Sequence, residues 1–309
     1  MNTLVLNRTN LLDNGKNNTL VYRFPRSVQF KDAEIAVSQV SMYYSWYNIS
    51  AALGNNTFSY TWVNGDVKTI TLPDGLYEIA DVNSFLQSEM IKNNHYLVNA
   101  SGNFVYYISL EVNATRYAVQ INTFKVPTSN EATAASLTDS SGSFPFRASS
   151  ANTQRFNPVV TIPAGFNNII GFDEGFATDA NLGGAFTAPA NQTYISISDA
   201  GTYSAISHSY PSNVYLAGTP DVQPNSSVLI NIDKVINEYA QPTGILYSVV
   251  PNVAIGALIN ERPAEYAFAK LVDGTYNELR VQFLGTDLQE ISIQDPEITL
   301  LLVIKNASS

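Results

Sequence analysis

The stretch EIAVSQVSMYYSWYNIS, at positions 34–50, decides the fold of this chain. It is rich in β-branched and aromatic residues and carries a single charge, Glu34. Such a segment predicts a long β-strand, in which successive side chains point to opposite faces of a sheet. A strand this long and this poor in charge must be covered on at least one face, either by a core or by a neighbouring subunit.

Further along, ITLPDGLYEIADVNSFLQSEMI at positions 70–91 changes its hydrophobic period. Asp74-Gly75 predicts a sharp turn. Asp81 is a suitable cap for a helix that runs to about Lys92. The apolar positions form one stripe on that helix, Val82, Phe85, Leu86 and Met90.

Composition favours a protein that associates with others. The chain has 309 residues, enough for one large β domain or two moderate ones. Only 14% of the residues are charged, against about 25% in typical soluble domains. A surface with so little charge is weakly protected against association, which indicates that much of it is buried in an assembly.

Charge and cysteine content exclude several classes of function. The net charge is -10 with a pI near 4.6, so we expect no direct nucleic-acid partner and no attachment to anionic membranes. The absence of cysteine excludes disulfides and thiolate chemistry. No secretory signal or membrane-spanning apolar run is recognisable, so we expect synthesis in the cytoplasm.

Period-two segments separated by Asn, Gly, Asp and Pro clusters recur along the whole chain. The predicted strands are Thr19–Phe24, Glu34–Asn48, Thr57–Val63, Val67–Leu72, Phe104–Val112, Tyr117–Phe124, Pro158–Ile162, Tyr194–Ser198, Ser227–Ile232, Ile245–Val250, Tyr266–Leu271, Glu278–Leu284 and Glu297–Lys305. Asn64-Gly65 predicts a two-residue hairpin turn. The C-terminal strand is apolar on both faces, so we expect it to be covered on both sides.

Other segments predict short helices and long loops. Phe166–Ile170 predicts one helical turn, and Asp233–Tyr239 a further one. Pro127–Phe156 is rich in Ser, Thr and Ala and predicts a long surface loop, and Asp173–Asn191 predicts a second.

Many short strands and few helices predict an all-β fold, a single jelly roll (an antiparallel β-sandwich) with an inserted, mostly-β domain and one or two short helices. We assign residues 1–50 and 215–309 to the jelly roll and residues 51–214 to the insertion. A rival partition places the middle strands in the roll itself and leaves only long loops outside it. Periodicity does not separate the two.

No pattern of reactive residues indicates an enzyme. The only histidines, His95 and His208, lack the neighbours that a metal site or a catalytic triad needs, so we expect both to be solvent-facing. Two acidic pairs, Asp173 with Glu174 and Glu261 with Glu265, are the sort of neighbours that 26 acidic residues produce by chance. Asp173–Asn181 contains several oxygen ligands but lacks the order of a calcium loop. We therefore expect no catalytic residue, no metal and no cofactor.

Four aromatic residues near the end of the long strand are our interface candidates, Tyr43, Tyr44, Trp46 and Tyr47. In a strand, alternate members point to opposite faces, so one set packs in the core and the other meets solvent or a partner. Tyr and Trp are favoured at protein interfaces. A platform that stacks against sugars is the alternative role.

Several segments together resemble the minor capsid (penton) proteins of virophages and Polinton-like double-stranded DNA viruses. The resemblance rests on VSMYYSWYNI at Val40–Ile49, ITLPDGLYEIADVNSFLQSEM at Ile70–Met90 and IPAGFNNIIGF at Ile162–Phe172. It continues from VQPNSSVLINIDKVIN to DPEITLLLVIKN in the last third of the chain. The order and spacing of these segments carry it, rather than any single motif.

The resemblance implies a jelly roll that stands at the five-fold vertices of an icosahedral capsid as a homopentamer. It implies double-jelly-roll major capsid proteins as neighbours and the virion as the location, with a host receptor as a further partner of unknown nature. The loops Thr128–Arg155 and Asp173–Asn191 would then be ordered by neighbouring subunits. Two other hypotheses stay open, a carbohydrate- or receptor-binding jelly roll and a β-sandwich glycosidase.

Overall fold

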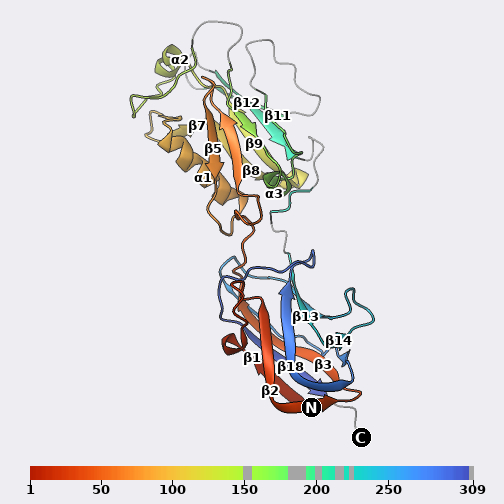
Figure 1. Cartoon of the computed structure of the whole chain (residues 1–309). Helices are drawn as coiled ribbons and strands as arrows, with labels where there is room; N and C mark the ends of the chain where they lie inside the picture. The colour runs from red at the N-terminus through yellow and green to blue at the C-terminus, as the bar shows by residue number, and fades with distance from the viewer. Residues whose placement is uncertain (149–154, 180–192, 199–203, 213–218, 223–225, 306–309) are drawn as a thin grey trace. The chain divides into compact units, whose positions relative to one another are not determined.

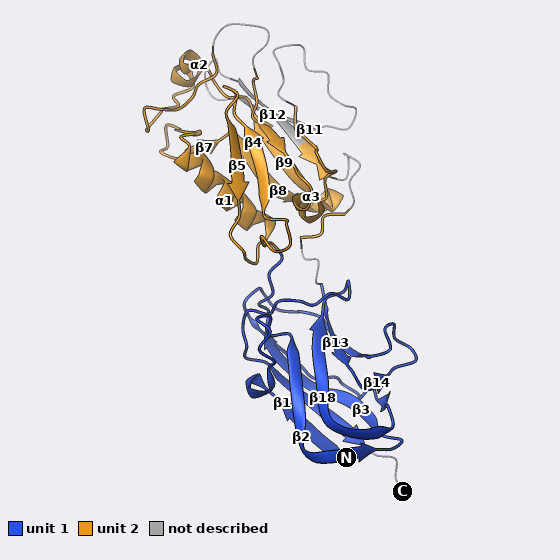
Figure 2. Ribbon diagram, viewed as in Figure 1, with its two compact units in different colours: residues 1–48, 223–309 blue, residues 49–222 orange. Residues whose placement is uncertain are grey.

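The structure is a computed structural model that describes the chain except residues 149–154, 180–192, 199–203, 213–218, 223–225 and 306–309. It divides into two compact units (Figure 2). Unit 1 comprises residues 1–48 and 223–309, and unit 2 comprises residues 49–222. Both units are mostly β, as the strand periodicity predicted.

Unit 1 consists of antiparallel pairs that join early strands of the unit to late ones (Figure 1). The pairs are β1 (Asn2–Leu6) with β19 (Thr299–Lys305), β2 (Thr19–Phe30) with β18 (Gly274–Leu284), β3 (Glu34–Tyr43) with β16 (Leu258–Glu261) and β17 (Ala269–Leu271), and β13 (Val228–Ile232) with β15 (Ile245–Val249). A short strand, β14 (Val235–Ile236), extends the sheet beyond β17.

These pairs give unit 1 the topology of a jelly roll. One sheet has the order β1-β19-β3, followed by β16 and β17, and the other has the order β15-β13-β18-β2. Without β14, and with β16 and β17 counted as one position, the described strands of unit 1 fill eight positions in chain order. The first strand then pairs with the eighth, the second with the seventh, the third with the sixth and the fourth with the fifth. Successive pairs alternate between the two sheets, as when a long hairpin is wound into a roll. The predicted fold class is confirmed.

The core of unit 1 lies between its two sheets. Burial alternates along β13, where Val228, Ile230 and Ile232 are inaccessible to solvent. The C-terminal strand β19 buries Leu302 on the core face and Val303 on the opposite face. On the face opposite the core, the expected coverage is therefore present only at Val303, whereas Thr299 and Leu301 are partly exposed.

A β-bulge in β3 sets which residues face this core. Leu301 pairs with Gln39 while the next residue, Leu302, pairs with Val37, so Ser38 is left without a partner in the ladder. One extra residue reverses the phase of the strand, since side chains alternate with a period of exactly two residues in regular pairing. The core face accordingly passes from odd-numbered to even-numbered residues: Ile35, Val37, Val40 and Met42.

In its described residues, unit 2 has two larger sheets, a hairpin and three α-helices. The sheets are β10-β4-β5, formed by Val159–Thr161, Thr57–Thr61 and Val67–Thr71, and β11-β12-β9-β8, formed by Thr193–Ser198, Ser204–Pro211, Ala118–Phe124 and Ile108–Asn113. The hairpin joins β6 (Tyr96–Val98) and β7 (Phe104–Tyr106), and the helices are α1 (Ile79–Lys92), α2 (Ser129–Ala134) and α3 (Phe166–Ile170). None of the helices described is long and apolar enough to cross a membrane.

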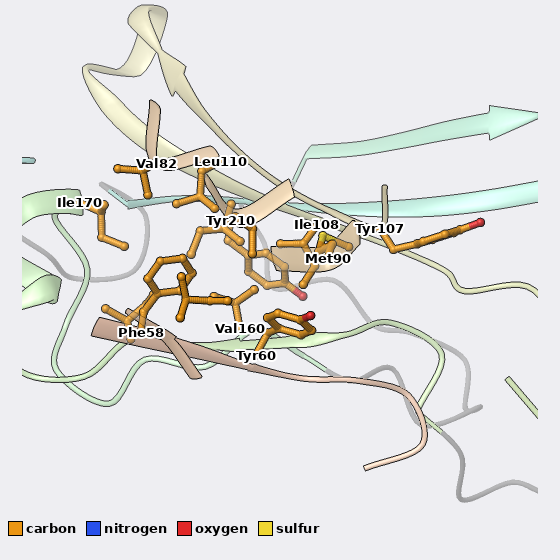
Figure 3. Close-up of a cluster of buried hydrophobic side chains, with 14 of the residues drawn as sticks. Phe58, Tyr60, Val82, Met90, Tyr107, Ile108, Leu110, Val160, Ile170 and Tyr210 are labelled. Carbon is orange, nitrogen blue, oxygen red and sulfur yellow. The ribbon is translucent and has the colours of Figure 1, made fainter. Parts of the chain in front are cut away.

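A continuous apolar core holds these elements of unit 2 together (Figure 3). Phe58 of β4 stacks on Phe166 of α3, with ring centroids 4.8 Å apart. The other members include Tyr60, Val82, Met90, Ile108, Leu110, Val160, Ile170 and Tyr210. They come from β4, α1, β8, β10, α3 and β12, so each of these elements depends on the others for its burial.

Two predicted helices are present, but the expectation that Asp81 caps the first one was wrong. The helix α1 starts before Asp81, because Glu78 is the N-cap residue and Asp81 accepts a hydrogen bond from its backbone N–H at 2.9 Å. The predicted turn Phe166–Ile170 is α3. Gly165 precedes it with φ of +84°, and a Cβ there would lie 2.2 Å from the carbonyl oxygen of Gly54, so this site requires glycine.

Other expectations were wrong. The predicted helical turn at Asp233–Tyr239 is instead a chain reversal that contains β14. The predicted loop Pro127–Phe156 contains α2, capped by the Thr128 side chain. The strands β1, β6, β12 and β16 were not predicted. Parts of the two predicted loops lie outside the described residues.

We predict that Leu302→Asp prevents stable folding of unit 1, because it places a carboxylate in a site with no solvent exposure. The cost is about 4 kcal/mol or more. Soluble yield and urea unfolding measure it, with Thr3→Asp as the control because Thr3 is exposed on the neighbouring strand. Equal midpoints for Leu302→Asp and Thr3→Asp would contradict the prediction.

Candidate assembly surface

The outer face of the β1-β19-β3 sheet carries exposed apolar residues. Val5, Leu301 and Gln39 form one cross-strand row on this face. Tyr43 lies on the same face, directly opposite Leu258 of β16. Val5 is 51% exposed and Leu258 is 45% exposed, although both belong to well-formed strands. We call this face, with Tyr266 at its margin, the outer face.

A surface hollow adjoins the outer face. Its lining residues are Ser38, Gln39, Arg262, Pro263, Ala264, Glu265, Tyr266 and Leu301. The Tyr266 hydroxyl lies 3.5 Å from the hydroxyl of Ser38, and Gln39 donates a hydrogen bond to Asn260 Oδ1 at 3.0 Å. The hollow is therefore lined by apolar side chains, polar groups and charges of both signs.

Lys305 and Glu34 lie beside residues 262–268, the segment that borders the hollow. Lys305 Nζ pairs with Glu34 and lies 4.3 Å from the centroid of the Phe268 ring, which in turn packs edge-on against Tyr266. Nearby, the Tyr247 hydroxyl donates a hydrogen bond to Glu261 Oε1. Burial, together with the Glu261 carboxylate, raises the pKa of Tyr247 to about 12.

The bulge in β3 determines which of the four predicted interface residues face the core. Tyr44 and Trp46 are 4% and 3% exposed and contact each other with ring centroids 4.4 Å apart. The backbone of Tyr44 bonds to Ala257, and Trp46 forms a bridge with Ile293. They belong to the core of unit 1.

Tyr43 and Tyr47 are partly exposed. An interface role stays a prediction for these two residues. Sequence reasoning did not identify Val5, Leu258 and Tyr266 as surface apolar residues, because hydrophobicity by itself predicts burial.

The acidic residues considered as catalytic or calcium-binding do not converge on a site. Glu261 accepts the Tyr247 hydroxyl, whereas Glu265 borders the hollow. Asp173 and Glu174 are exposed. Across the described parts of the chain, no group of three or more His, Cys, Asp or Glu side chains is placed to hold a metal ion.

In the candidate calcium segment, Thr178 and Asp179 form hydrogen bonds to β10 and β12. Thr178 Oγ1 accepts the N–H of Val160 at 2.9 Å, and the N–H of Asp179 donates to the Tyr210 hydroxyl at 3.1 Å. The last residues of this segment lie outside the described part of the chain.

His95 is buried in unit 2, so the expectation that it faces solvent was wrong. It is 2% exposed and lies parallel to the Trp62 ring at a centroid distance of 4.0 Å. Its Nδ1 is hydrogen-bonded to the Tyr60 hydroxyl at 2.8 Å. Burial, aided by the nearby Lys68 ammonium, lowers the pKa of His95 to about 4. For His208, only the backbone position in β12 lies within the described structure.

No protein-family model matches this sequence, and no curated protein matches it significantly. Among solved structures, the crystal structure of the selenomethionine-labelled mavirus penton protein is similar with a TM-score of 0.40 and 10% sequence identity. The match covers 98% of this chain and 97% of that one. The assignment of the fold rests on the strand order of unit 1, not on this similarity.

We predict that His95 makes the stability of unit 2 depend on pH. Its pKa is about 4 in the folded protein and 6.5 when unfolded, so the unfolded chain binds the extra proton between these values. The free energy of unfolding therefore rises with pH from about 4 to 6.5. The slope due to this residue is at most about 1.4 kcal/mol per pH unit.

Urea unfolding of wild type and His95→Gln at several pH values measures this contribution as the difference between their slopes. Both proteins should carry Trp46→Phe, so that Trp62 alone reports the unfolding of unit 2 by fluorescence. The carboxylates titrate in the same way in both proteins, so their contribution to the slope cancels when the two slopes are subtracted. Parallel pH profiles would contradict the prediction.

Proposed function

We propose that this protein is a structural capsid protein, a penton that forms homopentamers at the five-fold vertices of an icosahedral double-stranded DNA virus. In this proposal it is a component of the virion and has no enzymatic activity. It is surrounded there by a double-jelly-roll major capsid protein. Support comes from the sequence segments that resemble virophage pentons and from a jelly-roll topology of the kind that capsid proteins use.

The outer face is the observation that carries the proposal. Val5, Tyr43 and Leu258 lie on one face of a regular sheet, with Tyr266 at its margin, in a chain with only 14% charged residues. A grouped set of exposed apolar side chains on a folded domain marks an interaction site more often than a catalytic one. Such tyrosine and aliphatic residues suit a permanent interface, because the centre of an interface is enriched in aromatic residues and poor in charged ones.

A ring of copies also needs a second, different surface, because cyclic symmetry above two-fold joins unlike patches. Tyr239 of unit 1 provides a candidate, since its side chain is 99% exposed. Internal hydrogen bonds fix its turn: Asn237 Oδ1 accepts the N–H of Tyr239 at 3.1 Å, and Asn237 donates its own N–H to the Thr243 carbonyl oxygen at 2.7 Å. An exposed aromatic side chain on a hydrogen-bonded turn is a candidate anchor, because aromatic residues are enriched among the residues that dominate interface binding energy.

Mass photometry and sedimentation velocity test the proposal. The chain mass is 33.7 kDa, so a homopentamer has five times this mass, 168.5 kDa. We expect this species in the wild-type protein at micromolar concentration and at assembly-like salt and pH. A purely monomeric protein under all these conditions would overturn the proposal.

We predict that Leu258→Asp folds normally but loses the pentamer, because its carboxylate is solvated in the monomer and unpaired in an interface. The expected loss is about 2 kcal/mol or more per interface. Val67→Asp is the matched control, since Val67 is 64% exposed but lies in unit 2. A pentamer that survives Leu258→Asp would exclude the outer face as the interface.

A further inference from the structure

The β6–β7 hairpin of unit 2 presents a face made almost entirely of aromatic residues. Tyr96 and Val98 share one face of β6, and they pair with Tyr106 and Phe104 of β7. Between them, Leu97 points the other way and is fully buried in the core. The aromatic face thus lies on the side of the hairpin opposite Leu97. Phe104 on it is 50% exposed, whereas Tyr106 is partly buried and packs against the core.

The three rings of this face lie close to one another. The Tyr96 and Phe104 centroids are 4.8 Å apart with an interplanar angle of 53°. Phe104 and Tyr106 are 6.3 Å apart and nearly perpendicular, at 89°. The Tyr96 hydroxyl lies 3.3 Å from the hydroxyl of Ser140, so a polar edge borders the exposed ring face.

Hydrogen bonds hold the hairpin that carries these rings in place. In its turn, Asn99 Oδ1 accepts hydrogen bonds from the N–H groups of Ser101 and Asn103, both at 3.0 Å. Along the edge of β6 that does not face β7, Val98 and Thr138 exchange two backbone hydrogen bonds of 2.9 and 2.8 Å. A ligand would therefore meet rings that are already in place, which lowers the entropic cost of binding.

The size of the face indicates a small ligand. Each strand has three residues, about 10 Å in length, and the strands lie about 5 Å apart, so the face covers on the order of 100 Å². A stable protein interface needs roughly 800 Å² from each partner. The face is several-fold too small for a protein partner but large enough for one or two sugar rings.

The chemistry of the face indicates an uncharged ligand with an apolar side and hydroxyl groups. Its four side chains carry no charge. The nearby Asp139 carboxylate is already occupied, accepting hydrogen bonds from the N–H groups of Ser141 and Phe144 at 3.0 and 2.9 Å. Aromatic rings attract the C–H groups of such a ligand, while tyrosine hydroxyls supply hydrogen bonds at the edge.

We propose that the aromatic face of Tyr96, Phe104 and Tyr106 binds a neutral saccharide, with a pyranose ring stacked on Phe104. Such a site would give unit 2 the ability to recognise glycans. It does not depend on the assembly proposed above, because none of its residues belongs to unit 1.

Saturation-transfer NMR of the full chain tests the site with three disaccharides as probes: lactose, N,N'-diacetylchitobiose and α-1,2-mannobiose. We expect transfer to the ring C–H protons of at least one probe. Phe104→Ser should weaken that probe's binding at least about tenfold. Tyr117→Ser should not change it, since Tyr117 is an exposed aromatic residue elsewhere in unit 2, 75% accessible. Absence of transfer from all three probes would overturn the proposal.

Two further variants distinguish ring stacking from general apolar contact. Phe104→Trp keeps an aromatic face and should retain binding, whereas Phe104→Leu keeps the apolar character and should lose it. Equal binding by the Leu and Trp variants would also overturn the proposal. Thermal melting checks that each variant is folded, and its oligomer mass should equal that of the wild type, which separates a failure here from a failure of assembly.

Discussion

One additional residue in β3 determines which side chains of unit 1 face its core and which face its surface. Because Ser38 has no partner in the ladder, the strand changes phase, and even-numbered residues face the core beyond it. Without this change, the core would receive Tyr43 and Tyr47, and Tyr44 and Trp46 would face outward. The packing of Trp46 and the apolar outer face around Tyr43 and Leu258 both follow from this register.

The nested pairing explains how unit 1 accommodates an insertion of 174 residues, from Ile49 to Val222. The insertion interrupts the chain between β3 and β13, which are consecutive positions of the roll in different sheets. No ladder pair is broken, because β3 pairs with β16, β17 and β19, and β13 pairs with β15 and β18. Unit 2 in turn has its own apolar core, and among the described residues every strand pair lies within one unit.

The sequence predicted the fold class and most strands, because long alternating segments such as Glu34–Tyr43 carry a strong signal. It did not reveal β1 or β16, which are short and are stabilised by long-range pairing rather than by local pattern. The sequence analysis predicted that one alternating set of the aromatic cluster would face the core. The bulge at Ser38 leaves no mark in composition, so it was not predictable that this set is Tyr44 and Trp46. His95 looked like an ordinary loop residue because the rings that bury it, Tyr60 and Trp62, are more than 30 positions away.

The pairing of β1 with β19 also constrains the order in which the protein forms during synthesis. Unit 2 is one continuous segment that is complete once Val222 has left the ribosome, so it can fold while the chain is still growing. Unit 1 cannot close until Thr299–Lys305 is released, since that strand joins β1 to β3. Until then, the apolar faces of β1, β2 and β3 lack their final partners. Translation therefore completes the inserted unit before the roll that contains it.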